Sequence, residues 1–127
     1  MSSKNVLRLL QSAREIKAKT ADYTVVAGDF DSIFTTRGAA AGVTFTLPKA
    51  ANSSGGIVEF YAVADQDLII AGQDEELVVF NDLTADKIEF STTNEKIGGG
   101  FRAVCDGTSW IVVPLATETQ TVTVTSA

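Results

Sequence analysis

Over most of the chain, hydrophobic residues recur with a period of two, whereas a helix needs a period of about 3.6. In the clearest run, Val43, Phe45 and Leu47 share one face and Thr44 and Thr46 share the other. This alternation is typical of an antiparallel strand with one buried and one solvated face. Runs rich in Thr, Val and aromatic residues predict strands at residues 23–26, 32–36, 43–47, 57–63, 67–71, 77–80, 87–91, 101–105, 110–113 and 121–125.

Segments rich in Gly, Asp and Asn separate these runs and predict turns. Asp106-Gly107 gives the strongest hairpin signal, because Asp and Gly tolerate the positive φ values of tight turns. Asn81-Asp82 and residues 98–100 mark further turns. Strands spaced about 8–12 residues apart predict an all-β fold. We expect a single antiparallel β-sandwich or small barrel of about ten short strands over residues 20–127.

The last predicted strand differs from the others in its composition. Residues 117–125 are rich in Thr, and Val122 and Val124 supply the only hydrophobic side chains on one face. Such a strand buries little surface by itself. It is interpreted either as an ordinary edge strand or as a C-terminal arm, within residues 114–127, that pairs with the sheet of another subunit.

Composition excludes several classes of function. A chain of 127 residues fits one domain. It contains no His, which excludes a His-dependent triad, and a single Cys, which excludes an intrachain disulfide and a cysteine zinc site. The hydrophobic runs at 77–80 and 110–113 are far shorter than the ~18 residues of a membrane span. We therefore expect a non-enzymatic protein with no cofactor, no metal and no membrane segment.

Charge is distributed unevenly along the chain. Residues 1–19 hold five basic side chains and one acidic one, a net charge of +4, whereas the remaining residues hold five basic and fifteen acidic ones, a net charge of −10. An acidic protein of net charge −6 is not expected to bind nucleic acid. The basic segment is either a solvated helix face or an arm that docks on an acidic partner.

Residues 4–17 predict a short amphipathic helix at the start of this basic arm, residues 1–19. Its hydrophobic residues follow the i, i+3, i+4, i+7 spacing of one helix face. Such a face has to pack on the protein itself, on sister copies or on a larger particle. The candidate residues for contact with an oligomer or a capsid are Val6, Arg8, Leu9, Leu10, Ala13, Arg14 and Ile16.

No catalytic or ligand-binding motif emerges from the remaining residues. Residues 98–100 lack the spacing of a phosphate-binding loop, and the acidic pairs do not match a calcium loop. Cys105 has no His to activate it, so a structural thiol is favoured. Trp110, Tyr23 and Tyr61 could form a platform for a sugar, although the position of Trp110 in a hydrophobic run favours the core.

Several segments together resemble a known viral module. Residues 21–26 lead through 31–38 to 43–48, and residues 103–113 contain Asp106-Gly107-Thr108-Ser109-Trp110. Their order and spacing, over about residues 21–113, resemble a β-sandwich module of tailed-bacteriophage virion proteins. The module occurs in capsid decoration and head-fibre proteins and also in tail fibres.

This resemblance implies a non-enzymatic structural protein, often trimeric, that is made in the host cytoplasm and mounted on the outside of the virion. The favoured interpretation is a capsid decoration (cement) or head-fibre protein that stabilises the phage head. Its partners would be the major capsid protein and sister copies in a homotrimer. The alternative is a tail-fibre or receptor-binding module that contacts a cell-surface glycan, and a less favoured one is a hydrolase acting through surface carboxylates.

Overall fold

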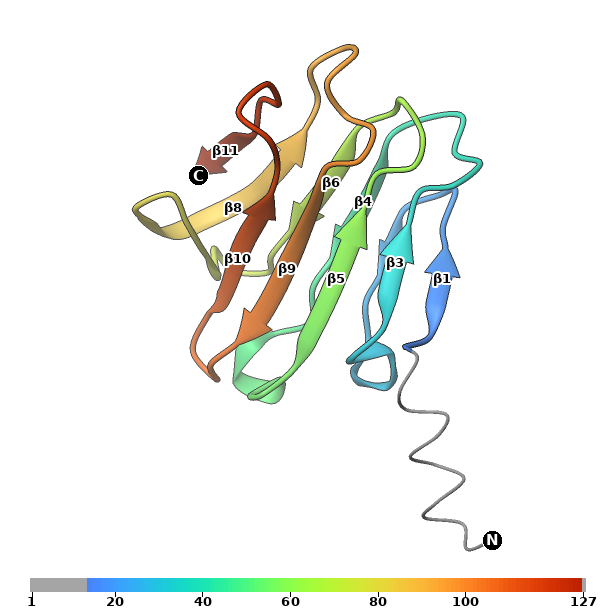
Figure 1. Ribbon diagram of the computed structural model, residues 1–127. Helices are drawn as coiled ribbons and strands as arrows, with labels where there is room; N and C mark the ends of the chain where they lie inside the picture. Colours follow the sequence, from blue (N-terminus) through green and yellow to red (C-terminus); the bar gives the residue numbers. More distant parts are fainter. Residues whose placement is uncertain (1–13, 127) are drawn as a thin grey trace, which may run out of the picture.

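The computed structural model describes residues 14–126 (Figure 1), and in this range it contains no α-helix. Two short 3-10 turns, Ala27–Asp29 and Ala50–Asn52, lie between strands. The strands are β1 (Ile16–Ala18), β2 (Tyr23–Thr24), β3 (Ile33–Thr35), β4 (Val43–Thr46), β5 (Ile57–Tyr61), β6 (Leu68–Ala71), β7 (Leu77–Val79), β8 (Asp82–Phe90), β9 (Gly100–Cys105), β10 (Trp110–Leu115) and β11 (Thr123–Ser126). The all-β prediction is confirmed, and each of the ten predicted strands overlaps an observed one.

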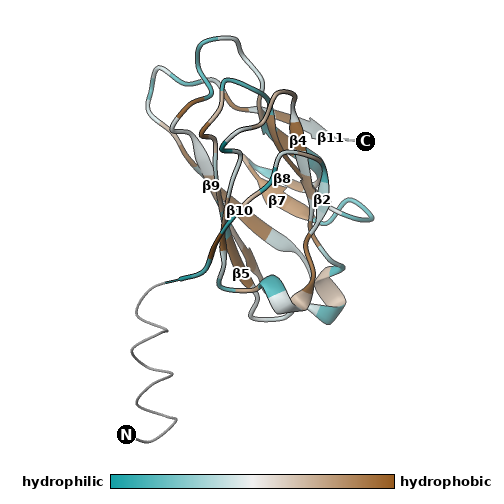
Figure 2. Cartoon of the chain, turned by 90° about the vertical axis from the view of Figure 1, so that its right-hand side faces the viewer, coloured by the Kyte–Doolittle hydropathy of each residue, from teal (hydrophilic) through white to brown (hydrophobic). Residues whose placement is uncertain are grey.

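All eleven strands belong to one continuous sheet that curls into a half-barrel (Figure 2). One side of the curl, called the first arm, has the strand order β1-β3-β5-β9-β10-β7. The opposite side, called the second arm, contains β2, β4, β6, β8 and β11. Strand β8 joins the arms, because its first residues pair with β7 and its last residues pair with β6.

The chain passes from one arm to the other at almost every connection, and this explains the direction of the strands. Strands β1, β3 and β5 enter the first arm, while β2, β4 and β6 enter the second. Neighbours among these six strands are therefore two strands apart in sequence, and they pair in parallel. Strands β7 and β10 are also parallel. The pairs β5–β9, β9–β10, β6–β8 and β8–β11 are antiparallel. The prediction of a purely antiparallel sandwich is wrong, and the sheet is mixed.

Aromatic side chains fill the space between the arms. The ring of Phe60 in the first arm lies 4.9 Å from Phe45 in the second and 5.7 Å from Phe34 beside it. Farther along, Phe90 in the second arm contacts Phe101 in the first at 4.8 Å. These rings are fully buried. Since each belongs to a strand with alternating burial, the period of two directs hydrophobic residues from both arms into one core.

The predicted helix at residues 4–17 is wrong where it can be compared with the structure. Residues 4–13 lie outside the described residues, and Ile16–Ala18 form strand β1 beside β3. Backbone bonds from Ile33 N–H to Glu15 O (2.9 Å) and from Lys19 N–H to Thr35 O (2.9 Å) fix this pairing. The free edge of β3 thus supplies hydrogen bonds that override local helix propensity, a common outcome for short segments.

The structure tests two predicted turns. Asp106 and Gly107 begin the loop between β9 and β10, where Gly107 has a φ of +93° and Asp106 Oδ1 accepts hydrogen bonds from the N–H groups of Thr108 and Ser109. This hairpin is confirmed. The turn predicted at Asn81-Asp82 lies one residue earlier, at Phe80 and Asn81, which have φ values of +47° and +64°. Strand β8 therefore starts sooner than predicted.

The C-terminal strand belongs to the sheet of its own chain. Residues Thr123 to Ser126 pair with β8, and Val122 and Val124 pack against the core. This arrangement agrees with the edge-strand interpretation of the Thr-rich tail.

Candidate functional site

The outward side of the first arm is hydrophobic, which is unusual for a sheet face that lies outside the core. Because side chains alternate along a strand, residues next to the buried ones point outward. Those of adjacent strands form rows, such as Ile57, Val104, Ile111 and Val78. The set, called the outer face below, comprises Ile16, Ala18, Ile33, Thr35, Ile57, Glu59, Tyr61, Val78, Arg102, Val104, Ile111, Val113 and Leu115.

Four hydrophobic side chains of the outer face are open to solvent. Ile16 is 66% exposed, Val113 46%, Ile111 40% and Leu115 38%. A solvated sheet face normally carries polar residues. Six strands at about 4.8 Å spacing make this face about 24 Å wide. The exposed hydrophobic side chains lie on β10 and on the edge strand β1, with Glu59 and Arg102 between Ile16 and Val113 in their row. Exposed hydrophobic side chains in this number make the face a candidate interaction surface.

The equivalent side of the second arm has the polar composition that a solvated sheet requires. One row of outward residues crosses β2, β4, β6 and β8 and consists of Thr24, Thr46, Ala71 and Lys87. Thr44, Ile69, Glu89 and Thr123 form the next. The hydrophobic rows thus belong to the first arm, although Leu83 at the start of β8 in the second arm is 74% exposed. The position of the outer face points to docking rather than to a requirement of the fold.

Charged groups on the outer face are few and balanced. Glu59 accepts a hydrogen bond from Tyr61 OH at 2.7 Å and forms an ion pair with Arg14, which also lies 3.3 Å from Asp31 Oδ1. Arg102 stands beside Glu59 in the row. The outer face therefore carries one acidic and one basic residue, although the whole chain has a net charge of −6. Its neutrality avoids the electrostatic repulsion that the acidic remainder would impose on a neighbour.

The structure brings two of the predicted contact residues to this surface. Ile16 lies on the outer face, and Arg14 is anchored to Glu59 at its edge, so both enter it as parts of a strand and its approach rather than of a helix. Val6, Arg8, Leu9, Leu10 and Ala13 lie outside the described residues.

Sequence reasoning missed the contribution of β10. Ile111, Val113 and Leu115 are the most exposed hydrophobic residues of the outer face after Ile16. A signal was present, because residues 110–115 are hydrophobic at every position, whereas a strand with one solvated face alternates. An uninterrupted run predicts a strand that is covered on both sides.

A partly buried ion pair connects the edge strands β1 and β2. Asp29, 4% exposed, accepts hydrogen bonds from Lys17 Nζ of β1 at 2.6 Å and from Tyr23 OH of β2 at 2.7 Å. The Val26 N–H also donates to this carboxylate at 3.0 Å. Lys19 Nζ lies 4.0 Å from the centre of the Tyr23 ring. We call Lys17, Tyr23 and Asp29 the seam cluster.

The seam cluster shifts the pKa values of its members in the directions expected for a structural ion pair. Burial alone would raise the pKa of Asp29, but the hydrogen bonds from Lys17, Val26 and Tyr23 outweigh it, so the pKa falls below its usual value. The hydrogen bond to Asp29 raises the pKa of Lys17 and, together with burial, that of Tyr23. Each shift favours the protonation state that holds the strands together.

Other candidates from the sequence have structural roles. Cys105 is buried, and desolvation raises the pKa of its thiol, as expected for a thiol inside the core. Trp110 is fully buried and donates from its indole N–H to Pro48 O at 2.8 Å, so it cannot serve as an exposed sugar platform. Gly98 adopts a φ of +86° in the predicted turn. Within residues 14–126, no group of three acidic or Cys residues is placed to hold a metal ion.

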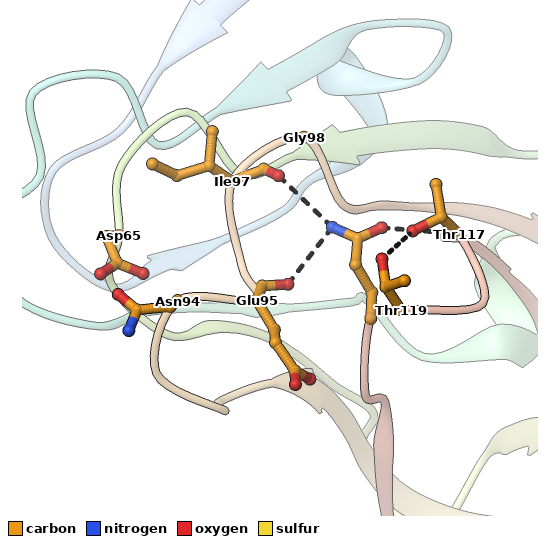
Figure 3. A pocket seen from close by; sticks show the side chains of 8 residues that line it. Asp65, Asn94, Glu95, Ile97, Gly98, Thr117 and Thr119 are labelled. Atoms are coloured by element: carbon orange, nitrogen blue, oxygen red, sulfur yellow. Dashed lines mark hydrogen bonds between the residues drawn. The ribbon is translucent and has the colours of Figure 1, made fainter.

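A pocket with a volume of about 540 Å³ lies at the end of the half-barrel that carries the loops after β5, β8 and β10 (Figure 1), and Figure 3 shows its lining from close by. It is formed where the loops after β5, β8 and β10 meet. We call it the polar pocket, because most of the residues that line it are polar. They are Asp65, Asn94, Glu95, Ile97, Gly98, Thr117, Thr119 and Gln120.

No protein-family model matches the chain, and no curated protein matches its sequence. Among the described residues, no helix is long and hydrophobic enough to cross a membrane.

Proposed function

We propose that the chain is a non-enzymatic structural protein of a tailed-bacteriophage virion, a capsid decoration (cement) or head-fibre protein that binds the outside of the head and stabilises it. The observation that carries the proposal is the outer face, where β10 exposes three hydrophobic side chains, Ile111, Val113 and Leu115. The resemblance of residues 21–113 to phage decoration modules is the reason for proposing a phage virion as the particle.

The outer face is well suited to a permanent contact. Permanent interfaces are more hydrophobic than transient ones and are depleted of charge at their centre. At about 24 Å wide and about 15 Å along the strands, the face is smaller than the about 800 Å² that one partner buries in a standard interface. The basic residues 1–19, which lead into this face through Arg14, would supply further contact area.

The partners proposed are the major capsid protein and sister copies of this chain in a homotrimer. Bridging neighbouring capsid subunits would add interface that disassembly must break. A trimer would have a mass of about 40 kDa, three times the 13.4 kDa of the chain. No internal repeat is visible in the sequence, whereas fibres usually contain repeats, and this favours the head over the tail.

Immunogold electron microscopy of intact particles, with an antibody against this chain, tests the proposal. Gold distributed over the head is the expected result, together with a mass of about 40 kDa for the free protein in light scattering. Gold confined to the tail would contradict the proposal and favour the receptor-binding alternative. Particles without any label would contradict a place in the virion.

A further inference from the structure

The polar pocket combines a rigid wall with side chains that are free to bind. Gln120 forms the rigid part, because its Nε2 donates to Glu95 O at 3.2 Å and to Ile97 O at 3.3 Å while its Oε1 accepts from Thr117 N–H at 3.0 Å (Figure 3). Glu95 Oε2 in turn accepts from Thr121 N–H at 2.9 Å. These bonds hold the loops after β8 and β10 together before any ligand arrives.

Hydrogen-bonding groups remain available around this wall. The hydroxyl groups of Thr117 and Thr119 lie 2.9 Å apart, and either can donate to the other and still accept from a ligand. Asp65 and Asn94 lie on the other side of the pocket (Figure 3). Both are exposed, and neither side chain has a hydrogen-bond or ion-pair partner within residues 14–126. The pocket thus offers acceptors and donors from three separate loops.

The chemistry of the lining selects the class of ligand. Asp65 and Glu95 are acidic and the lining contains no Lys or Arg, so anions are disfavoured. Carboxylates, amides and hydroxyls together suit a ligand with many hydroxyl groups, and Ile97, which is 63% exposed, offers a hydrophobic surface to C–H groups. The volume of about 540 Å³ lies within the usual range for small-molecule sites.

We infer that the polar pocket binds a neutral saccharide. The inference does not depend on the proposed attachment to a phage head. The two are compatible in space, because the loops of the pocket lie at the end of the half-barrel opposite the start of β1 (Figure 1). A protein anchored through residues 1–19 and the outer face would leave this end open to a sugar.

Titration of the full-length ¹⁵N-labelled protein with methyl glycosides of glucose, galactose, mannose and N-acetylglucosamine tests the inference. Ligands of this size bind with dissociation constants of about 1–10 mM when one small pocket is used. We expect one of them to shift the amide signals of Asn94, Ile97 and Gly98. A trisaccharide of the same sugar is then compared with the methyl glycoside that binds. Tighter binding of the trisaccharide would identify a polymeric glycan as the natural ligand, whereas equal affinity would identify a single sugar.

Two variants and a control make the result specific. Asp65→Ala and Thr119→Val should each weaken binding by about tenfold, since each removes a polar group that faces the ligand. Asp86→Ala, on β8 and outside the pocket, should leave the affinity unchanged. The inference is overturned if no glycoside shifts these signals at about 50 mM. It is equally overturned if the shifts lie elsewhere, if Asp65→Ala binds normally, or if calcium chloride shifts the same signals at lower concentration.

Discussion

Thr44 and Thr46 point outward from β4 in the second arm, whereas Ile111 and Val113 point outward from β10 in the first. The inward residues of the two strands are alike, since Phe45 and Trp110 are both fully buried. Folding therefore imposes the same requirement on both arms, which is a hydrophobic inner face. The outward positions are free of that requirement, and the difference between them is the basis of the proposal that the first arm contacts a partner.

We expect the inner faces of both arms to contribute to the stability of one shared core. Phe60→Ala removes a ring that contacts Phe34 in its own arm and Phe45 in the other, and should lower the free energy of unfolding by about 3–5 kcal/mol. Thr46→Ala, on the outward side of the second arm, should change it by less than about 0.5 kcal/mol. Urea denaturation measures both. Two separate transitions, or a loss below about 1 kcal/mol for Phe60→Ala, would contradict a shared core.

The seam cluster joins the free edges of the two arms. Asp29→Asn removes the charge that neutralises Lys17, and should cost about 2–3 kcal/mol of stability, less than a fully buried pair because the Lys17 side chain is 22% exposed. In a double-mutant cycle with Lys17→Met, the coupling energy should exceed about 1 kcal/mol. Additive effects of the two substitutions would show that the ion pair does not join the strands.

The outer faces should differ in binding and not in stability. Val113→Lys places a charge in the hydrophobic face and should weaken association with sister copies or the particle by about thirtyfold, about 2 kcal/mol. Thr46→Lys, the matched change on the second arm, should have no effect on association. Cosedimentation with particles and light scattering provide the measurements. Equal losses from both variants would assign no special role to the first arm.

The seam cluster should also make the stability of the protein depend on pH, and this effect should be smaller than those of the substitutions above. The pKa of Asp29 is lowered in the folded protein, so its stabilising contribution is present above the usual carboxyl pKa and is lost as the pH falls through the lowered value. The pKa values of Lys17 and Tyr23 are raised, so their contributions are present below their usual pKa values and are lost as the pH rises through the raised ones.

Thermal unfolding of the wild type and Asp29→Asn over the acidic and alkaline ranges measures this contribution. We expect the stability difference between them to be largest near neutral pH and to shrink toward both extremes. A difference that stays constant with pH would contradict the pKa shifts.

The sequence predicts which residues face the core far better than it predicts strand direction. Alternation in β4 and the Asp106-Gly107 turn depend on local chemistry, and both agree with the structure. Parallel pairing, such as that of β3 with β5, depends on which arm each strand enters. Residues distant in sequence decide that choice, and the period of two carries no information about it.

The outer face was predicted only in part for the same reason. The helical pattern includes Arg14 and Ile16, yet they reach the outer face because β1 pairs with β3. The hydrophobic residues at 111, 113 and 115 were visible in the sequence, but their place beside Val104 and Val78 follows from the pairing of β10 with β9 and β7. The polar pocket is assembled from three loops and has no local signature at all.

Maleimide labelling of particle-bound protein tests most directly the claim that the first arm's outer face is covered in the assembled virion. Val113→Cys and Thr46→Cys place a thiol at equivalent outward positions on the two arms, and the native Cys105 contributes little background because it is 2% exposed. Both variants should label fully as denatured chains. On the particle, we expect Val113→Cys to be protected and Thr46→Cys to label rapidly. Equal labelling of the two thiols on the particle would contradict the account.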